Sequence, residues 1–126
     1  MVAGDRLVYT VMGDLIQRLG KGTAGKHGYQ ALGAVVGATH PSVLKELRYR
    51  LDKTFFLVPG YGVQGGTAAD VRHAFDKLGR GAIVNASRSI MCAWQKTGRD
   101  GADYQEAARA AAEKMRDEIR QYVTIL

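Results

Sequence analysis

A β-prone run that leads into a glycine-rich loop and then a helix start most restricts how this chain can fold. Residues 54–58 (TFFLV) are mostly apolar, and residues 59–66 follow with the sequence PGYGVQGG. Thr67 and Asp70 then supply a hydroxyl and a carboxylate three residues apart, a spacing typical of a helix N-terminus. The stretch predicts a strand, a tight loop and a helix in succession.

The glycine content of this loop suggests that its backbone comes close to another group. Four glycines within seven residues are more than a turn requires. Exposed N–H groups beside a helix N-terminus favour an anion, most often a phosphate. A plain connector with loose glycine usage explains the loop equally well, because glycine-rich loops are common. The loop alone therefore leaves both readings open.

Composition excludes several classes of protein. The length of 126 residues suits one domain, and 46% hydrophobic with 24% charged residues is typical of a globular chain. Cys92 is the only cysteine, which excludes an internal disulfide and a cysteine metal cluster and suits a reducing compartment. Apolar runs are too short for a membrane span, and the N-terminus does not resemble a signal peptide. We therefore expect a cytoplasmic protein with no membrane partner.

The net charge of +6 raises the question of a nucleic-acid partner. Basic residues are interspersed with acidic ones, as in residues 45–48 (KELR) and 116–120 (RDEIR), which is typical of solvated helix faces. We therefore expect no nucleic-acid binding. A modest positive bias would still help to capture an anionic small molecule.

Hydrophobic periodicity predicts an α/β chain. Helices are expected at residues 5–19, 41–51, 68–78 and 104–123, with a short helical stretch at 90–94. Strands are expected at residues 33–39, 54–58 and 81–88, and the first and third of these read as buried on both faces because their apolar residues do not alternate. The order is a helix followed by three βα units, the rhythm of parallel β/α folds.

In such folds the chemistry lies at the carboxyl ends of the strands. Here those ends carry Thr39 and His40, then residues 59–66, then Ser87 and Arg88. We expect all three to lie on one face. Three parallel strands are too few for a closed sheet, and a bare parallel edge favours aggregation. The chain therefore reads as the later part of a larger fold.

Three motifs together resemble the last three strand ends of orotidine 5′-phosphate decarboxylase, most closely its longer bacterial subfamily. They are residues 37–41 (GATHP), 59–66 (PGYGVQGG) and 85–90 (NASRSI). The resemblance covers nearly the whole chain. It implies the C-terminal portion of a (β/α)₈ TIM barrel, so that residues 1–126 form a single partial barrel domain with no second domain.

The resemblance also implies roles for individual residues. Arg88 would grip the substrate phosphate, helped by the backbone N–H groups of Ser87 and Arg88, and Gln64 would bridge the phosphate and the pyrimidine. Pro59 would line the pocket wall, with Gly60, Tyr61 and Gly65 on the loop that folds over the substrate. A ligand contact by Tyr61 is only one possibility, and Thr39 and His40 are possible site residues without an assigned role.

The catalytic part of the family pattern is missing. An Asp-x-Lys-x-x-Asp motif supplies the lysine that protonates C6 as carbon dioxide leaves, and it occurs nowhere in these 126 residues. The implied chain is a decarboxylase segment that binds orotidine 5′-phosphate or UMP, uses no cofactor and is inactive alone. A fragment, a truncated gene product and one half of a split enzyme all fit. Its implied partner is a second copy or a complementing N-terminal half-barrel.

Other readings compete with this one. His27, His40 and His73 lack metal-ligand spacing, so no metal is expected, and Ser87 has no evident His–Asp partners for a nucleophile. Arg88 by itself fits a structural salt bridge. A phosphate-binding half-barrel without catalysis is the main functional alternative, and another phosphate-binding barrel enzyme is a third.

Overall fold

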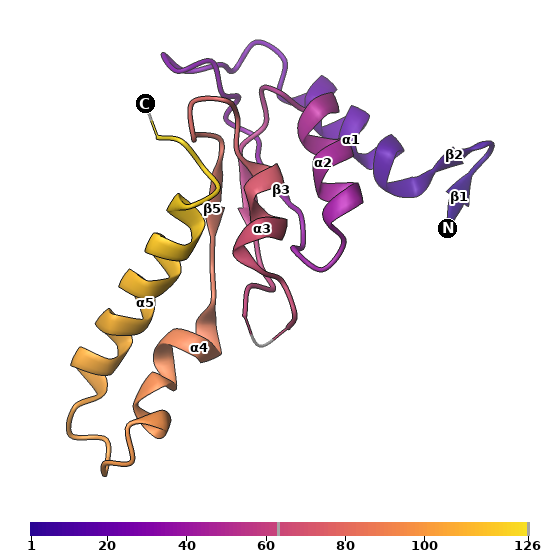
Figure 1. Ribbon diagram of the computed structural model, residues 1–126. Helices are drawn as coiled ribbons and strands as arrows, with labels where there is room; N and C mark the ends of the chain where they lie inside the picture. Colours follow the sequence, from indigo (N-terminus) through magenta and orange to yellow (C-terminus); the bar gives the residue numbers. More distant parts are fainter. Residues whose placement is uncertain (63, 126) are drawn as a thin grey trace.

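Three parallel strands form the sheet around which the helices pack. The structure, a computed structural model, describes residues 1–62 and 64–125. Its elements are β1 (Val2–Ala3), β2 (Arg6–Leu7), α1 (Val8–Leu19), β3 (Ala34–Val35), α2 (Pro41–Arg50), β4 (Phe56–Val58), α3 (Ala68–Val71), the 3₁₀ helix η1 (Arg72–Ala74), β5 (Ala82–Val84), α4 (Ser87–Met91), the 3₁₀ helix η2 (Ala93–Lys96) and α5 (Tyr104–Arg120). The strand order is β3-β4-β5, all parallel (Figure 1). The predicted α/β class with three parallel strands and flanking helices is confirmed.

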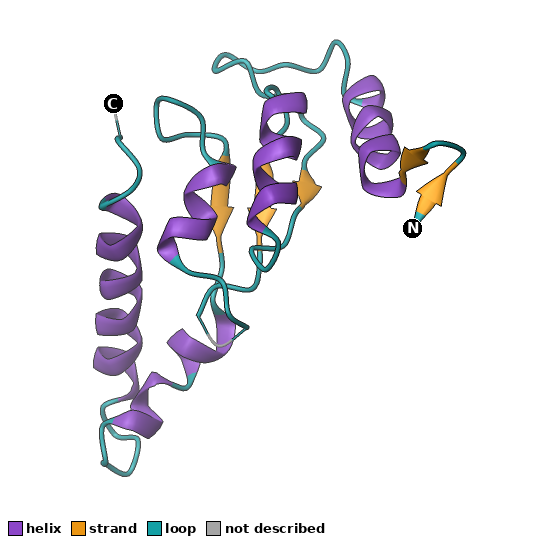
Figure 2. Ribbon diagram, turned by 45° about the vertical axis from the view of Figure 1, so that its right-hand side comes forward, coloured by secondary structure: helices purple, strands orange, loops and turns teal. Residues whose placement is uncertain are grey.

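The two faces of this sheet differ in what covers them. Helices α2 and α3 lie over one face (Figure 2), where Phe56 and Val58 are fully buried against Leu44 of α2 and Val71 of α3. This face holds the core. Burial of such side chains stabilises the fold by roughly 1.5–3 kcal/mol each.

On the opposite face Val35, Leu57 and Ile83 lie side by side in register, one from each strand. Their side chains are 70%, 42% and 57% exposed. The prediction that the first and third strands are buried on both faces is therefore wrong for this chain. Unbroken apolar strands need cover on both faces, and the described helices supply it on only one.

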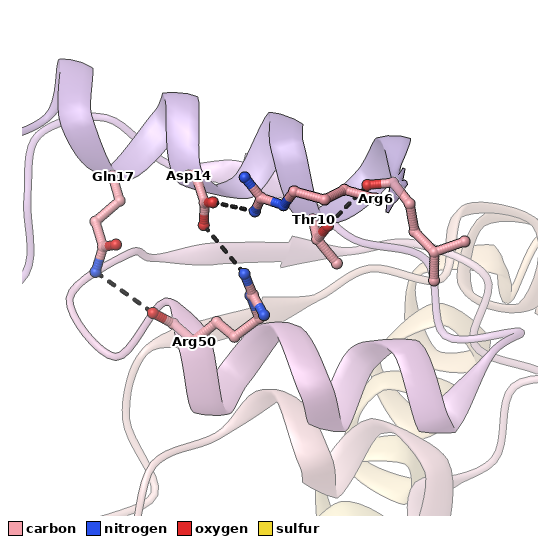
Figure 3. A network of polar contacts seen from close by, with 6 residues as sticks. Arg6, Thr10, Asp14, Gln17 and Arg50 are labelled. Carbon is pink, nitrogen blue, oxygen red and sulfur yellow. Dashed lines mark hydrogen bonds and ion pairs between the residues drawn. The ribbon is translucent and has the colours of Figure 1, made fainter. Parts of the chain in front are cut away.

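Helix α1 packs on α2 through a glycine and a polar network (Figure 3). A Cβ at Gly13 would lie 3.3 Å from a methyl group of Leu51, so glycine allows the two helices to approach closely. Asp14 accepts hydrogen bonds from Arg6 and from Arg50, the latter at 3.5 Å, and Gln17 donates to the Arg50 carbonyl at 3.4 Å. Each exposed ion pair of this kind contributes little to the stability of the fold.

Arg48 departs from the prediction of a solvated helix face. Its side chain is buried, its guanidinium carbon lies 3.8 Å from the centre of the Phe56 ring, and Nη2 donates to the Thr54 carbonyl at 2.5 Å. Burial lowers the pKa of Arg48, and Tyr29 partly offsets that effect. Arg48 therefore joins α2 to the residues before β4, a role that charge patterning did not reveal.

Several predicted boundaries are corrected. The first helix begins at Val8, because residues before it form the β1–β2 hairpin. The helix expected at 68–78 ends at Val71 and passes into the 3₁₀ turn η1. Residues 76–80 form a turn in place of the expected helix end, since the Asp76 carboxylate accepts hydrogen bonds from the N–H groups of Leu78 and Arg80 and from the Tyr29 hydroxyl, all at 2.6–2.9 Å. A carboxylate that bonds nearby amides favours a turn over a helix.

Candidate functional site

Two of the three predicted strand ends form a single cavity. The loop after β4 and the start of α4 lie at the same end of the sheet (Figure 1). Between them is a cavity of about 90 Å³. Its lining consists of Pro59, Gly60, Tyr61, Gln64, Asn85, Ala86, Ser87, Arg88 and Ser89. Residues far apart in sequence therefore meet where parallel β/α folds place their ligands.

The glycine-rich loop owes its course to residues without a side chain. Gly60, Gly62 and Gly65 have φ values of 97°, 78° and 98°, which L side chains rarely adopt. Gly66 is required for another reason, because a Cβ there would lie 2.7 Å from both the Ala38 Cβ and the Gly60 carbonyl oxygen. Val63, in the same stretch, lies outside the described residues.

Backbone hydrogen bonds hold this loop in a compact form. The Gly62 N–H donates to the Gly66 carbonyl at 2.8 Å, and the Gly66 N–H donates to the Gly60 carbonyl at 3.0 Å. The helix that follows starts as predicted. Thr67 Oγ1 accepts from the Asp70 N–H at 3.3 Å, and the Asp70 carboxylate accepts from the Thr67 N–H at 2.9 Å. Hydrogen bonds therefore hold both the loop backbone and the start of the helix that follows it.

Tyr61 lies on the loop but turns its hydroxyl toward α5. That hydroxyl donates to the carboxylate of Glu118, and the ring packs against the hydrophobic core. Burial and this hydrogen bond raise the pKa of Tyr61 well above its usual range, so it remains a neutral donor. Tyr61 lines the cavity, but its polar atom is already engaged by Glu118.

Ser87 and Arg88 lie in the first turn of α4 rather than on the strand. The first N–H groups of a helix have no partner within it, so those of Ser87 and Arg88 are available at the cavity. Both side chains are exposed. Arg88 takes part in none of the ion pairs found among residues 1–62 and 64–125, so its reading as a structural salt bridge gains no support.

The third strand end lies next to the cavity without lining it. Thr39 Oγ1 and His40 Nδ1 are 3.1 Å apart, and a Cβ at Gly60 would lie 3.6 Å from the Thr39 methyl group. Within the part of the chain that the structure describes, the cavity lining includes neither residue. Thr39 therefore packs against the loop at Gly60, and His40 is in contact with Thr39.

Sequence reasoning had not singled out every residue at this site. Asn85, Ala86 and Ser89 line the cavity although only their neighbours Ser87 and Arg88 were chosen as candidates. Their membership of the third motif was the available signal. Glu118 had no sequence signal, because only folding brings a helix residue 57 positions away to Tyr61.

Neither a metal cluster nor a membrane helix emerges from the described ranges. Within residues 1–62 and 64–125, no group of three or more His, Cys, Asp or Glu side chains is placed to hold a metal ion. The helices in these ranges are also too short or too polar to cross a bilayer. The cavity instead offers an arginine, hydroxyl groups and backbone N–H groups, which are donors suited to a phosphate.

Comparison with known proteins gives a consistent result. No protein-family profile matches the chain. The orotidine 5′-phosphate decarboxylase of Clostridium perfringens strain SM101 is 49% identical over 122 residues, which cover 96% of this chain and 42% of that protein. A second relative, from Clostridium acetobutylicum, is 44% identical over 117 residues and bears the same name. The chain spans about two fifths of the length of these curated relatives.

Solved structures agree in fold. The UMP synthase of Leishmania donovani superposes with a TM-score of 0.65 and 32% identity over 95% of this chain and 24% of its own. An orotidine-monophosphate-decarboxylase from Toxoplasma gondii has a TM-score of 0.72 over 98% of this chain and 45% of its own, at 24% identity, and so shows the fold alone. Over nearly its whole length, this chain is therefore similar to a segment of orotidine 5′-phosphate decarboxylase, the family whose motifs it resembles.

Proposed function

We propose that this chain is the phosphate-binding segment of an orotidine 5′-phosphate decarboxylase, the enzyme that converts orotidine 5′-phosphate to UMP and carbon dioxide. One observation carries the proposal. The glycine-rich loop and the Ser87–Arg88 turn line a single cavity in a chain that is 49% identical to an enzyme of that name. The ligand is then orotidine 5′-phosphate or UMP, bound through its phosphate.

The residues that we propose to bind the ligand have roles that their chemistry supports. Arg88 offers a planar fork of donors to the phosphate, and the N–H groups of Ser87 and Arg88 add to it. Gln64 lines the same cavity from the loop, and its proposed role is to bridge the phosphate and the base through its amide. Pro59 forms the wall, and Gly60 lets the loop backbone come close to the ligand. Gly65 was expected at the pocket, but among the described residues it lines the hollow toward α5 instead, and its φ of 98° serves the turn of the loop.

Catalysis in this proposal requires residues that this chain does not carry. No Asp-x-Lys-x-x-Asp sequence occurs in its 126 residues, so no lysine is placed in such an array to protonate C6. Binding energy from the phosphate would still be available to close the site and stabilise the transition state once the remaining part is present. Residues 1–126 form one partial barrel domain, completed by an N-terminal half-barrel or covered by a second copy, in the cytoplasm.

Calorimetric titration with UMP tests the binding role. The purified chain should bind UMP, and Arg88→Ala should weaken binding by about tenfold to a hundredfold, since a charge-assisted hydrogen bond contributes roughly 1.5–3 kcal/mol. Arg109→Ala is the matched control, because Arg109 is an 80% exposed arginine that pairs with Glu113 on α5. A folded chain that fails to bind UMP, or that binds it equally without Arg88, would contradict the proposal.

A second experiment separates the enzyme segment from a phosphate-binding half-barrel without catalysis. The chain is mixed with the N-terminal portion of the Clostridium perfringens relative, which carries the part that this chain does not span. Decarboxylation by the mixture, absent from either part alone and lost with Arg88→Ala, is the expected result. A stable mixed complex that binds UMP without decarboxylating orotidine 5′-phosphate would favour the half-barrel alternative.

A further inference from the structure

The glycine-rich loop lies between two hollows. On one side is the site cavity, and on the other is a hollow of about 570 Å³ that separates the loop from α5. Tyr61, Gly62, Gly65 and Gly66 line this second hollow together with Glu118. The Gly66 end of the loop packs closely on Ala38, but around Tyr61 and Gly62 the second hollow leaves open space beside the loop. Individual polar contacts therefore matter more here than in a packed segment.

One side chain of the loop reaches across to α5. The Tyr61 hydroxyl donates to the Glu118 carboxylate, and Glu118 is also 3.8 Å from the Lys114 ammonium group on the same helix. Hydrogen bonds to an ionised acceptor are about twice as strong as bonds between neutral groups. This bond joins residues 57 positions apart and ties the loop to a helix of 17 residues.

The backbone transmits this restraint to the ligand side of the loop. Tyr61 pairs with Gly66 in a short bridge, and the Gly62 and Gly66 N–H groups donate within the loop at 2.8 and 3.0 Å. Gln64 lies inside this closed segment and lines the cavity. Tyr61, Gln64 and Arg88 all line the site cavity, so a shift of Tyr61 into the second hollow would change the shape of the cavity that Gln64 and Arg88 share.

We propose that the hydrogen bond between Tyr61 and Glu118 is a clasp that holds the glycine-rich loop in its ligand-receptive conformation. Glu118 is then a positioning residue of the site although it does not line the cavity. The identity of the ligand rests on the proposed function, but the clasp itself does not. Through this bond α5 sets the affinity of a phosphate site from outside it.

A double-mutant cycle with Tyr61→Phe and Glu118→Ala tests the clasp. NMR hydrogen exchange measures the protection of the Gly62, Gly65 and Gly66 N–H groups, and UMP titration measures affinity. Each single variant should speed exchange at these glycines and weaken UMP binding about tenfold. The double variant should be no worse than either single one, because both remove the same bond.

Two further variants separate positioning from a general structural effect. Glu118→Gln keeps an acceptor oxygen and should restore most of the exchange protection and affinity lost in Glu118→Ala. Glu113→Ala removes an exposed carboxylate from the same helix and should change neither quantity. Exchange within α5 should stay constant in all folded variants.

The outcomes distinguish this inference from the proposed function. Unchanged exchange at the three glycines in folded Tyr61→Phe and Glu118→Ala variants would overturn the clasp, even if UMP binds. Additive effects of the two substitutions would overturn it as well. If the unaltered chain binds no UMP but both variants speed loop exchange without additivity, the clasp stands and the proposed binding by this chain fails.

Discussion

Gly66 and Gly60 allow the loop after β4 to fold against Ala38 and Thr39, which follow β3. The Gly66 backbone lies so close to Ala38 and to the Gly60 carbonyl that a methyl group has no room. Gly60 has a φ of 97° and packs against Gln64 and Thr39. At the residue scale, the shape of the candidate site therefore depends on which side chains are absent as well as on which donors are present.

Substitution of Gly66 by alanine should destabilise the chain and impair the site. The added Cβ meets two atoms at 2.7 Å, one of them backbone, so the loop must shift at a cost of about 1–3 kcal/mol. Urea unfolding measures this change, and UMP titration should show weaker binding. Gly37→Ala is the control, because a Cβ there meets only Thr39 Oγ1 at 4.0 Å. Equal stability of the two variants would contradict the packing argument.

Alkaline pH should weaken the fold through partly buried tyrosine hydroxyls that are hydrogen-bonded to carboxylates. Burial and hydrogen bonds to Asp76 and Glu118 raise the pKa values of Tyr29 and Tyr61 above 10, the usual value. A raised pKa means that the folded state holds the proton more tightly than the unfolded state. The resulting stability is complete below pH 10 and is lost as the pH rises above it.

Denaturation between pH 8 and pH 12 checks this expectation. The free energy of unfolding of the unaltered chain should fall above pH 10, and Tyr61→Phe should reduce the steepness of that fall. Tyr49→Phe is the matched control, since the Tyr49 side chain is 89% exposed. Removal of its hydroxyl should leave the dependence of stability on pH unchanged. A profile with the same slope in Tyr61→Phe would show that Tyr61 does not carry the effect.

At the scale of elements, short helices in this chain depend on local polar groups. Helix α3 has four residues and begins with a reciprocal pair of hydrogen bonds between Thr67 and Asp70. Hydrogen bonds from the Thr67 hydroxyl and from the Thr67 N–H to the Asp70 carboxylate lower the pKa of Asp70. Because α3 directly follows the glycine-rich loop, this cap also sets where the loop ends.

Removal of the Thr67 cap should lower the free energy of unfolding more than removal of an exposed hydroxyl elsewhere. Thr67→Ala deletes the side chain that accepts from the Asp70 N–H and should lower the free energy of unfolding by about 1 kcal/mol. Ser42→Ala removes an exposed hydroxyl from the first turn of α2 and should change it by less than about 0.5 kcal/mol. Chemical denaturation of the two variants gives the comparison, and equal losses would contradict a capping role.

At the scale of the whole molecule, the sheet has one covered and one open face. The open face carries a row formed by Val35, Leu57 and Ile83, all between 42% and 70% exposed. A separate apolar hollow, between β5 and α5, is lined by Ile83, Met115 and Ile119, among others. Contiguous apolar surfaces of this kind mark places where other protein surfaces bind.

The row should drive association of the isolated chain. We expect concentration-dependent self-association in light scattering, reduced by Leu57→Ser, which places a hydroxyl at the centre of the row. Tyr49→Ser is the control, because it replaces another exposed large side chain on α2, away from the sheet. A monomeric chain at all concentrations, or equal effects of the two substitutions, would contradict this expectation.

Local sequence determined the classes of element and several of their starts. The proline of α2, the Thr67–Asp70 pair of α3 and the glycines after β4 act through contacts within a few residues, so their patterns can be read directly. The parallel direction of the strands could also be predicted from the sequence, since a helix between two strands is typical of a parallel crossover connection. The motifs likewise brought Gln64, Ser87 and Arg88 together as candidates before their shared cavity was visible.

Tertiary structure alone decided features that depend on partners distant in sequence. Residues 76–80 form a turn instead of a helix end because Tyr29, 47 residues away, and nearby amides converge on the Asp76 carboxylate. Arg48 became buried because Phe56 and the Thr54 carbonyl lie beneath it. Glu118 reached Tyr61 only through the packing of α5, and exposure of the strand row followed from which face the helices cover. Periodicity reports a side chain's neighbours along the chain, whereas these outcomes depend on neighbours that folding brings near.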